Sequence, residues 1–184
     1  MGGGVALAMM RDLGREQRLV NGLVLADTIC YPQIPPWFIL ALRLPVIPSI
    51  IMRLIPERWG FILLKHAMYH SARGMNPEAI EEYADCLRSE GGHAALINVS
   101  RHMAPEDIDN FVRDYSSINV STSLVWGKQD RVIPVRLGRR LASAIPDAQI
   151  HEIDRCGHVP QEEYPEIVAP LLAQFLNAVA QNSD

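Results

Sequence analysis

The sequence has no excess of positive charge. Its 17 Lys and Arg residues are outnumbered by 21 Asp and Glu residues, which gives a net charge of -4, and the basic residues are scattered along the chain. Proteins that bind nucleic acids present a concentrated basic surface to the phosphate backbone. We therefore expect no nucleic-acid partner.

Cysteine is also scarce. Cys30, Cys86 and Cys156 are widely spaced, odd in number, and form no C-x-x-C pair. Such a pattern predicts neither a disulfide framework nor a zinc knuckle, so we expect reduced thiols and no metal. The N-terminus lacks the succession of cationic, apolar and small residues that marks a secretion signal. Together these absences predict a cytoplasmic protein.

No uninterrupted hydrophobic run is long enough to cross a membrane. The most apolar stretch, residues 36–55, contains Arg43, Arg53 and internal prolines, whereas a spanning helix needs about 20 mainly apolar residues. We expect short helices over a pocket that takes a small apolar substrate. The candidate lining residues are Trp37, Phe38, Met52 and Trp59, although aromatic residues at such spacing are also common in ordinary packing.

The apolar residues that are present predict a folded α/β domain. The chain has 184 residues, of which 48% are hydrophobic, and this is enough to fill one core. Its beginning and its end alternate between helix-like and strand-like periodicity. The predicted helices cover residues 5–13, 135–144 and 164–180, and the predicted strands cover residues 22–27, 123–126 and 148–153. Strands that alternate with helices indicate a parallel sheet with right-handed crossovers.

Residues 28–117 have a different character. Six prolines stand between residues 32 and 56, and no convincing strand pattern follows them. Helical patterns begin at Pro77 and Pro105, and Gly91 and Gly92 interrupt the periodicity between them before it resumes at Ala94. We interpret this block as a helical insertion into the α/β domain.

Two polar residues stand in the loops just past the last two predicted strands. Asp130 follows the strand that ends at Trp126, and His158 follows the strand that ends at Ile153. Parallel sheets place their active sites at these strand ends. A carboxylate there can accept the Nδ1–H of an imidazole and so orient the ring as a general base. Plainer interpretations also exist, because Asp130 could be a turn former or the ion-pair partner of Arg131, and a single histidine is often structural.

Three segments resemble motifs of the α/β-hydrolase fold superfamily, and they occur in the order found in that family. Residues 124–134 resemble the strand and loop that carry the triad acid, and residues 157–160 with Glu163, Pro165 and Glu166 resemble the triad-histidine loop. Residues 2–7 resemble the end of the nucleophile elbow G-x-S-x-G. The resemblance implies an α/β class chain with a partial α/β-hydrolase fold. Its core would be the last three parallel strands with flanking helices, residues 1–27 and 118–184, and its inserted helical cap would be residues 28–117.

The resemblance also implies a hydrolase that cleaves an ester or a similar bond through a covalent intermediate, without metal or cofactor. Asp130 would orient His158, and His158 would act first as base and then as acid. Aligned on the elbow, the nucleophile would stand immediately before Met1, and no other G-x-S-x-G occurs in the sequence. The alternative to serine at that position is an aspartate, as in family members that act on epoxides or haloalkanes.

The remnant of the elbow sets further expectations. Gly2 and Gly3 would let the first helix pack closely under the nucleophile. The nitrogen of Met1 would stand in the place of a backbone oxyanion donor, but in degraded form, as a terminal amine. We therefore expect the 184 residues alone to be hydrolytically inactive. The rival interpretation is a non-catalytic truncated fragment or interaction module, and in either case the strand near Leu23 would leave an apolar sheet edge open for self-association.

Overall fold

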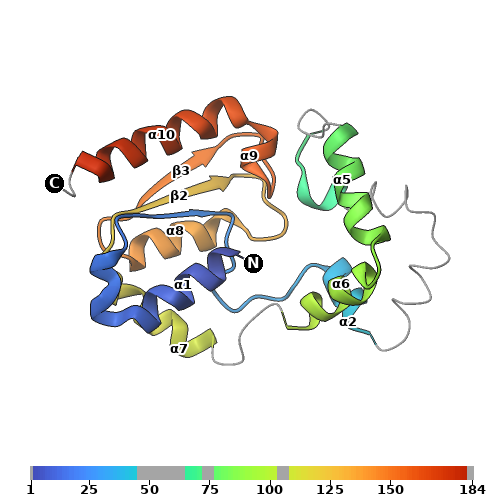
Figure 1. Ribbon diagram of the computed structural model, residues 1–184, viewed down its shortest axis with the longest axis horizontal. Helices are drawn as coiled ribbons and strands as arrows, with labels where there is room; N and C mark the ends of the chain where they lie inside the picture. Colours follow the sequence, from blue (N-terminus) through green and yellow to red (C-terminus); the bar gives the residue numbers. More distant parts are fainter. Residues whose placement is uncertain (1, 45–64, 72–76, 103–107, 182–184) are drawn as a thin grey trace.

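Three strands form a parallel sheet, which lies between helices in the left half of Figure 1. The structure is a computed structural model that describes residues 2–44, 65–71, 77–102 and 108–181. The strands lie side by side in the order β1 (Leu23–Ala26), β2 (Thr122–Gly127) and β3 (Gln149–Ile153). In the register of the sheet, Leu124 is paired with Leu25 on one side and Ile150 on the other. The predicted α/β class and the three predicted parallel strands are confirmed.

Helices cover both faces of this sheet. On one face lie α1 (Gly2–Leu13) and α8 (Val135–Ala144), and on the other lies α10 (Pro165–Gln181) (Figure 1). The remaining short elements of these layers are η1 (Gly14–Leu19), α7 (Ile108–Arg113), η3 (Asp114–Ser117) and α9 (Pro160–Glu163). The three helices predicted for this domain are confirmed, except that α1 already begins within the run of glycines.

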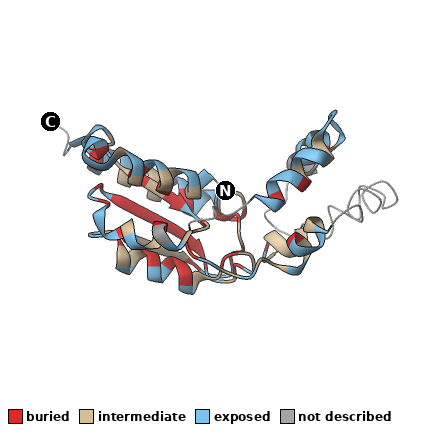
Figure 2. Ribbon diagram, turned by 90° about the horizontal axis from the view of Figure 1, so that it is seen from below, coloured by how far each residue is buried: buried red, intermediate tan, exposed pale blue. Residues whose placement is uncertain are grey.

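The two faces of β2 contribute to two separate apolar clusters. Leu124 and Trp126 belong to the larger cluster, which also contains residues of α1, α7 and α8, whereas Val125 packs with Ile153 and with Val168 of α10. All six residues of β2 are buried, as expected for a parallel strand that is covered on both faces. Figure 2 shows the same concentration of buried residues in the strands and in the helix faces that contact them. The loops that follow the strands are thereby held on a rigid base.

The glycine run at the start of α1 allows one close contact with the segment after β1. A Cβ atom on Gly3 would lie 1.8 Å from Oγ1 of Thr28, and this distance is too short for any side chain at position 3. A Cβ atom on Gly2 would have no neighbour within 4 Å. Close packing against Thr28 is therefore found at Gly3, and the packing of Gly2 and Gly3 under the nucleophile stays a prediction.

A block of helices lies beside the sheet domain (Figure 1). It contains α2 (Trp37–Arg43), α5 (Pro77–Arg88) and α6 (Gly92–Arg101). As predicted, the described part of residues 28–117 contains no strand. The α6 helix begins two residues earlier than the apolar pattern indicated, since Gly91 at φ 80° precedes it as a left-handed N-terminal residue. None of the described helices is long and apolar enough to cross a membrane.

The larger apolar cluster crosses the predicted limits of this block. Cys30 and Tyr31 at its beginning, and Phe111 and Tyr115 at its end, are buried together with the strands. The division into a core (residues 1–27 and 118–184) and a cap (residues 28–117) therefore stays a prediction. The cysteines Cys30, Cys86 and Cys156 are all free, as expected.

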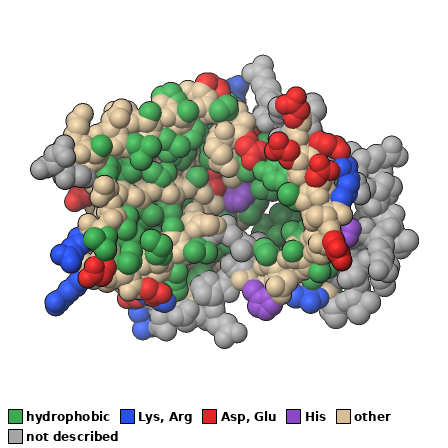
Figure 3. Space-filling model, in the orientation of Figure 1, with side chains coloured by type: hydrophobic (Ala, Val, Ile, Leu, Met, Phe, Trp, Pro, Cys, Tyr) green, Lys and Arg blue, Asp and Glu red, His purple; other side chains and the backbone are tan. Residues whose placement is uncertain are grey.

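The open edge expected near Leu23 is present in the described structure. β1 pairs with β2 on one side, and no described strand pairs with its other side. Figure 3 shows hydrophobic side chains gathered on the face of the molecule that carries β1. Val5 and Met9 of the neighbouring α1 are among the exposed apolar side chains. A sheet edge of this kind is a template for pairing with another strand.

Candidate active site

Asp130 lies in the loop between β2 and α8 and is 6% exposed. Its Oδ1 accepts hydrogen bonds from the backbone N–H groups of Val132 at 2.7 Å and Ile133 at 2.9 Å. These bonds are those of a turn-forming aspartate. Its Oδ2 lies 2.9 Å from Nδ1 of His158. The same carboxylate therefore has both predicted roles: Oδ1 stabilises the turn, and Oδ2 pairs with His158.

His158 lies in the loop between β3 and α9, and its side chain is 18% exposed. Its backbone N–H donates a hydrogen bond to the carbonyl oxygen of Met68 at 2.6 Å. The carboxylate beside Nδ1 favours the tautomer that carries its proton on that nitrogen. The lone pair is then on Nε2. An imidazole oriented in this way can take a proton from a nucleophile and later return it.

A second buried acid, Glu163 of α9, holds the histidine loop in place. Its carboxylate accepts hydrogen bonds from the backbone N–H of Gly157 at 2.5 Å, of His70 at 3.1 Å and of Ser71 at 3.2 Å. These partners belong to two segments that are distant in the sequence. Glu163 is part of the motif that resembles the histidine loop, but its role could not be inferred from the sequence. Every residue except proline has a backbone N–H, so no residue type marks the partners of Glu163.

Gly157 completes this contact between the two segments. A Cβ atom at this position would lie 2.4 Å from the carbonyl oxygen of Met68 and 2.7 Å from the backbone nitrogen of His70. Backbone atoms cannot move aside as the end of a flexible side chain can, so only glycine fits at residue 157. The histidine loop and residues 65–71 are thus packed backbone against backbone.

A third buried acid, Asp27, follows β1 and was not predicted. Its Oδ1 accepts a hydrogen bond from the backbone N–H of Gly127 at 3.1 Å, and its Oδ2 has no partner. Burial of the carboxyl group and the adjacent Asp130 carboxylate raise the pKa of Asp27 to about 9. The signal that could have found it is the one used for Asp130, namely an acidic residue directly after a buried strand.

Polar atoms of Asp27, Asp130 and His158 all lie within 4.8 Å of one another. Carboxylates and an imidazole can also bind a metal ion. Here Nδ1 of the histidine is engaged with Asp130, and the other oxygen of Asp130 accepts two backbone N–H bonds. The arrangement is therefore that of a carboxylate–imidazole pair, and the expectation that neither metal nor cofactor is needed stays a prediction.

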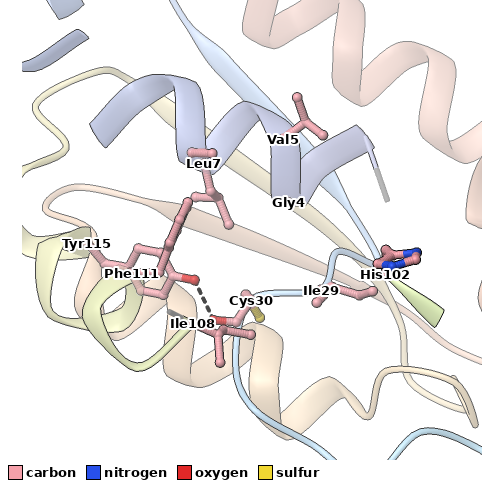
Figure 4. Close-up of a pocket in the computed structure, with 10 residues that line it drawn as sticks. Gly4, Val5, Leu7, Ile29, Cys30, His102, Ile108, Phe111 and Tyr115 are labelled. Atoms are coloured by element: carbon pink, nitrogen blue, oxygen red, sulfur yellow. Dashed lines mark hydrogen bonds between the residues drawn. The ribbon is translucent and has the colours of Figure 1, made fainter. Parts of the chain in front are cut away.

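The described structure contains two apolar pockets. One, of about 210 Å³, lies between α1 and α7, where the hydroxyl of Tyr115 donates a hydrogen bond to the carbonyl oxygen of Cys30 (Figure 4). The other includes Val132 and Ile133, whose amides bind Asp130. His158 lines neither pocket.

The other residues predicted for the site are not joined to it by any described contact. Trp37 is 66% exposed and packs against Phe38 with the ring centroids 6.1 Å apart, and neither lines the two pockets. Met1, Met52 and Trp59 lie outside the described residues. Their assignment to the oxyanion site or to the substrate pocket, and that of Gly2 and Gly3 to the elbow, stays a prediction.

Curated proteins with similar sequences include two hydrolases. A 2-hydroxy-6-oxononadienedioate/2-hydroxy-6-oxononatrienedioate hydrolase from a Pseudomonas species is 28% identical over 100 residues, which cover 54% of this chain and 30% of that protein. A 2-hydroxymuconate semialdehyde hydrolase from Pseudomonas putida is 34% identical over 83 residues, which cover 45% of this chain and 30% of that protein. The chain spans about a third of the length of such relatives.

Solved structures resemble nearly the whole described fold. A thermophilic esterase from Thermogutta terrifontis matches with a TM-score of 0.67 and 26% identity over 97% of this chain and 62% of that chain. A meta-cleavage product hydrolase from Pseudomonas fluorescens IP01 matches with a TM-score of 0.71 and 20% identity over 96% of this chain and 61% of that chain, and this shows the fold alone. The family model described as the alpha/beta hydrolase family matches residues 1–171. With the motifs, the parallel sheet and this match in agreement, the chain belongs to the alpha/beta hydrolase family.

Proposed function

We propose that this chain supplies the acid and the histidine of a hydrolase catalytic triad, with Asp130 orienting His158. The observation that carries the proposal is the 2.9 Å distance between Oδ2 of Asp130 and Nδ1 of His158. The two side chains come from loops that follow neighbouring parallel strands, β2 and β3. Membership of a hydrolase family and the position of the pair at the strand ends both support this assignment.

The proposed reaction proceeds through a covalent intermediate. A serine hydroxyl, supplied from outside the 184 residues, transfers its proton to Nε2 of His158 while its oxygen attacks the carbonyl carbon of the substrate. The tetrahedral intermediate collapses as the leaving group takes the proton from Nε2. Water then repeats the two steps on the acyl-enzyme. Asp130 stays ionised and stabilises the imidazolium that forms in each half-reaction.

An aspartate nucleophile would change the first step and leave the second largely as it is. Its carboxylate would attack carbon without giving up a proton, and the halide would leave or the epoxide C–O bond would open. His158 would then act as the base for the water that hydrolyses the ester intermediate. The Asp130–His158 pair would keep the same geometry in both cases. The identity of the nucleophile therefore decides between ester-like substrates and epoxides or haloalkanes.

We propose a small, largely apolar substrate with an ester or similar bond. The two described pockets are lined mainly by apolar side chains, among them Ile29, Ile39 and Phe111, and one of them includes Val132 and Ile133, whose N–H groups bind Asp130. The proteins that this chain resembles include an esterase and hydrolases of 2-hydroxy-6-oxo acids. A panel of esters and 2-hydroxy-6-oxo acids is the appropriate assay.

The test compares the 184-residue chain with a longer polypeptide that is encoded by extending its reading frame upstream to a G-x-S or G-x-D segment. We expect the longer polypeptide to hydrolyse p-nitrophenyl butyrate or a substrate of the panel, and the 184 residues alone to be inactive. Alanine in place of the upstream nucleophile is the control. Turnover by the 184 residues alone would contradict the assignment of the nucleophile. An inactive longer form, or an in-frame stop codon in place of the segment, would contradict the hydrolase proposal.

The open edge of β1 supports the second candidate, an interaction module that associates with a second copy of itself. The backbone N–H of Leu23 donates to the carbonyl oxygen of Ser121, just before β2, and that of Asp27 donates to the carbonyl oxygen of Val125 in β2. Because N–H directions alternate along a strand, the N–H of Val24 faces away from β2. This group is available to pair with a strand of another copy.

Proline at position 24 provides the corresponding test. Val24→Pro is expected to reduce concentration-dependent association in sedimentation velocity, because it removes only the outward N–H of an edge strand. The matched control is Leu25→Pro, which removes an N–H directed toward β2 and is expected to unfold the chain. A wild-type chain that stays monomeric at all concentrations tested would contradict the self-association.

A further inference from the structure

The buried carboxyl group of Asp27 has no role in the mechanism described above. The residue is 5% exposed, and its Oδ2 is a buried polar atom without a hydrogen-bond partner. The other oxygen, Oδ1, accepts the N–H of Gly127 at 3.1 Å. A carboxylate in water has both oxygens solvated, so an unpartnered buried oxygen strongly disfavours the ionised form.

The backbone of Asp27 holds the side chain in this place. Its φ of 39° lies in the left-handed region of backbone conformation. Residues other than glycine adopt this region rarely, although aspartate does so more often than most. The N–H of Asp27 donates to the carbonyl oxygen of Val125, so the residue is fixed to β2 through its main chain as well as through Oδ1. Such conformations persist where the surroundings determine them, and they are frequent at functional sites.

The neighbours of Asp27 include more acidic groups than basic ones. Asp130 lies beside it, Glu163 on α9 adds a second carboxylate, and the Cys156 thiol interacts electrostatically with all three carboxyl groups. The only described group of this cluster that can carry a positive charge is His158, and its Nδ1 is already engaged with Asp130. Asp130 itself accepts hydrogen bonds from three N–H groups, those of Val132, Ile133 and the His158 ring. Two adjacent buried carboxylates with one imidazole cannot both be ionised without a large electrostatic cost.

We propose that Asp27 is a neutral carboxylic acid at neutral pH, whose Oδ2 hydroxyl is directed toward the Asp130 carboxylate and positions it for His158. Asp27 is then a positioning residue: its proton satisfies the otherwise unpartnered oxygen and keeps a single negative charge opposite a single imidazole. The raised pKa of Asp27, which has the same physical causes, agrees with this protonation state. The inference rests on the geometry of the three side chains and does not require that the chain hydrolyse any substrate.

Infrared spectroscopy of the full 184-residue chain, with aspartate labelled at its side-chain carboxyl carbon, tests the protonation state directly. At pH 7 we expect the absorption of one protonated, buried carboxyl group, and we expect it to disappear on ionisation at high pH. The same signal should be absent from Asp27→Asn and present in Asp147→Asn. Asp147 is the matched control because it also has a positive φ, of 55°, but is exposed. A wild-type spectrum without a protonated aspartate at pH 7 would overturn the proposal, whether or not the variants fold.

The charge that Asp27 presents to His158 is tested by nuclear magnetic resonance titration of the imidazole. If Asp27 is neutral, Asp27→Asn replaces one uncharged group by another of similar shape, and the His158 proton affinity should change by less than about threefold. If Asp27 were ionised, the substitution would remove a negative charge, and the affinity should fall about tenfold or more. Tight binding of added Zn²⁺ that depends on Asp27 would also overturn the proposal, because a metal ligand must be ionised. Neither measurement uses hydrolysis, so a result that contradicts the neutral Asp27 is distinct from a result that contradicts the proposed function.

Discussion

Replacement of His158 by alanine is expected to lower kcat for ester hydrolysis by about 10⁴-fold or more in the polypeptide that carries the nucleophile. Without Nε2, no described group in this loop can take the proton of the nucleophile or protonate the leaving group. The effect should fall on kcat rather than on KM, because His158 lines neither of the described pockets. Steady-state hydrolysis of the best substrate in the panel measures both constants.

Asp130→Asn tests whether catalysis needs the Asp130–His158 pair or only His158 as the base. An amide in place of the carboxylate can present its NH₂ group to Nδ1, and this would favour the wrong tautomer of His158, with an expected loss of about 10⁴-fold in kcat. The double variant should be little worse than His158→Ala, since residues that act as a unit are not additive. His93→Ala, on α6, should leave kcat unchanged. Near wild-type activity in Asp130→Asn would mean that the pair is structural.

The sheet domain could be predicted from the sequence because each of its elements has a local signal. The apolar residues of β2 are bounded by polar residues and by Gly127, and this pattern predicted the strand that the structure contains. Helix α8 coincides with its predicted limits, residues 135–144. The start of α1 is the exception, since the weak helix propensity of the glycines predicted a later beginning. Packing of Gly3 against Thr28 outweighs that local preference.

The candidate site was only partly accessible to the same reasoning. Asp130 and His158 could be found because each follows a strand at the same edge of the sheet. Asp27 obeys the same rule, but its significance depends on burial and on the proximity of Asp130, which no local pattern encodes. Glu163 acts through the amides of His70 and Ser71, 93 and 92 residues away. Long-range contacts to backbone atoms are determined by the fold and have no residue-type signature.

The contacts of Glu163 predict a large loss of stability on substitution. Its ionised carboxylate accepts the N–H groups of Gly157, His70 and Ser71 in a buried position. Glu163→Gln keeps the size of the side chain and one acceptor oxygen but replaces the other by a donor, which would face N–H groups that are donors themselves. Hydrogen bonds to charged groups contribute about 1.5–3 kcal/mol each, so a loss of about 3 kcal/mol in the free energy of unfolding is expected. Urea denaturation at neutral pH measures it.

The same substitution should act on the histidine loop before it acts on the whole fold. Glu163 is the described side chain that connects residues 70–71 with Gly157, one residue before His158. Amide hydrogen exchange is therefore expected to increase at His70, Ser71 and Gly157, while the amides of β2 stay protected under native conditions. Glu166→Gln, on the exposed first turn of α10, is the matched control. It should change neither the free energy of unfolding nor the free energy of local opening at these amides by more than about 0.5 kcal/mol. If Glu163→Gln were as stable as this control, the histidine loop would be held by its backbone contacts, namely the packing at Gly157 and the hydrogen bond from His158 to Met68, and not by Glu163.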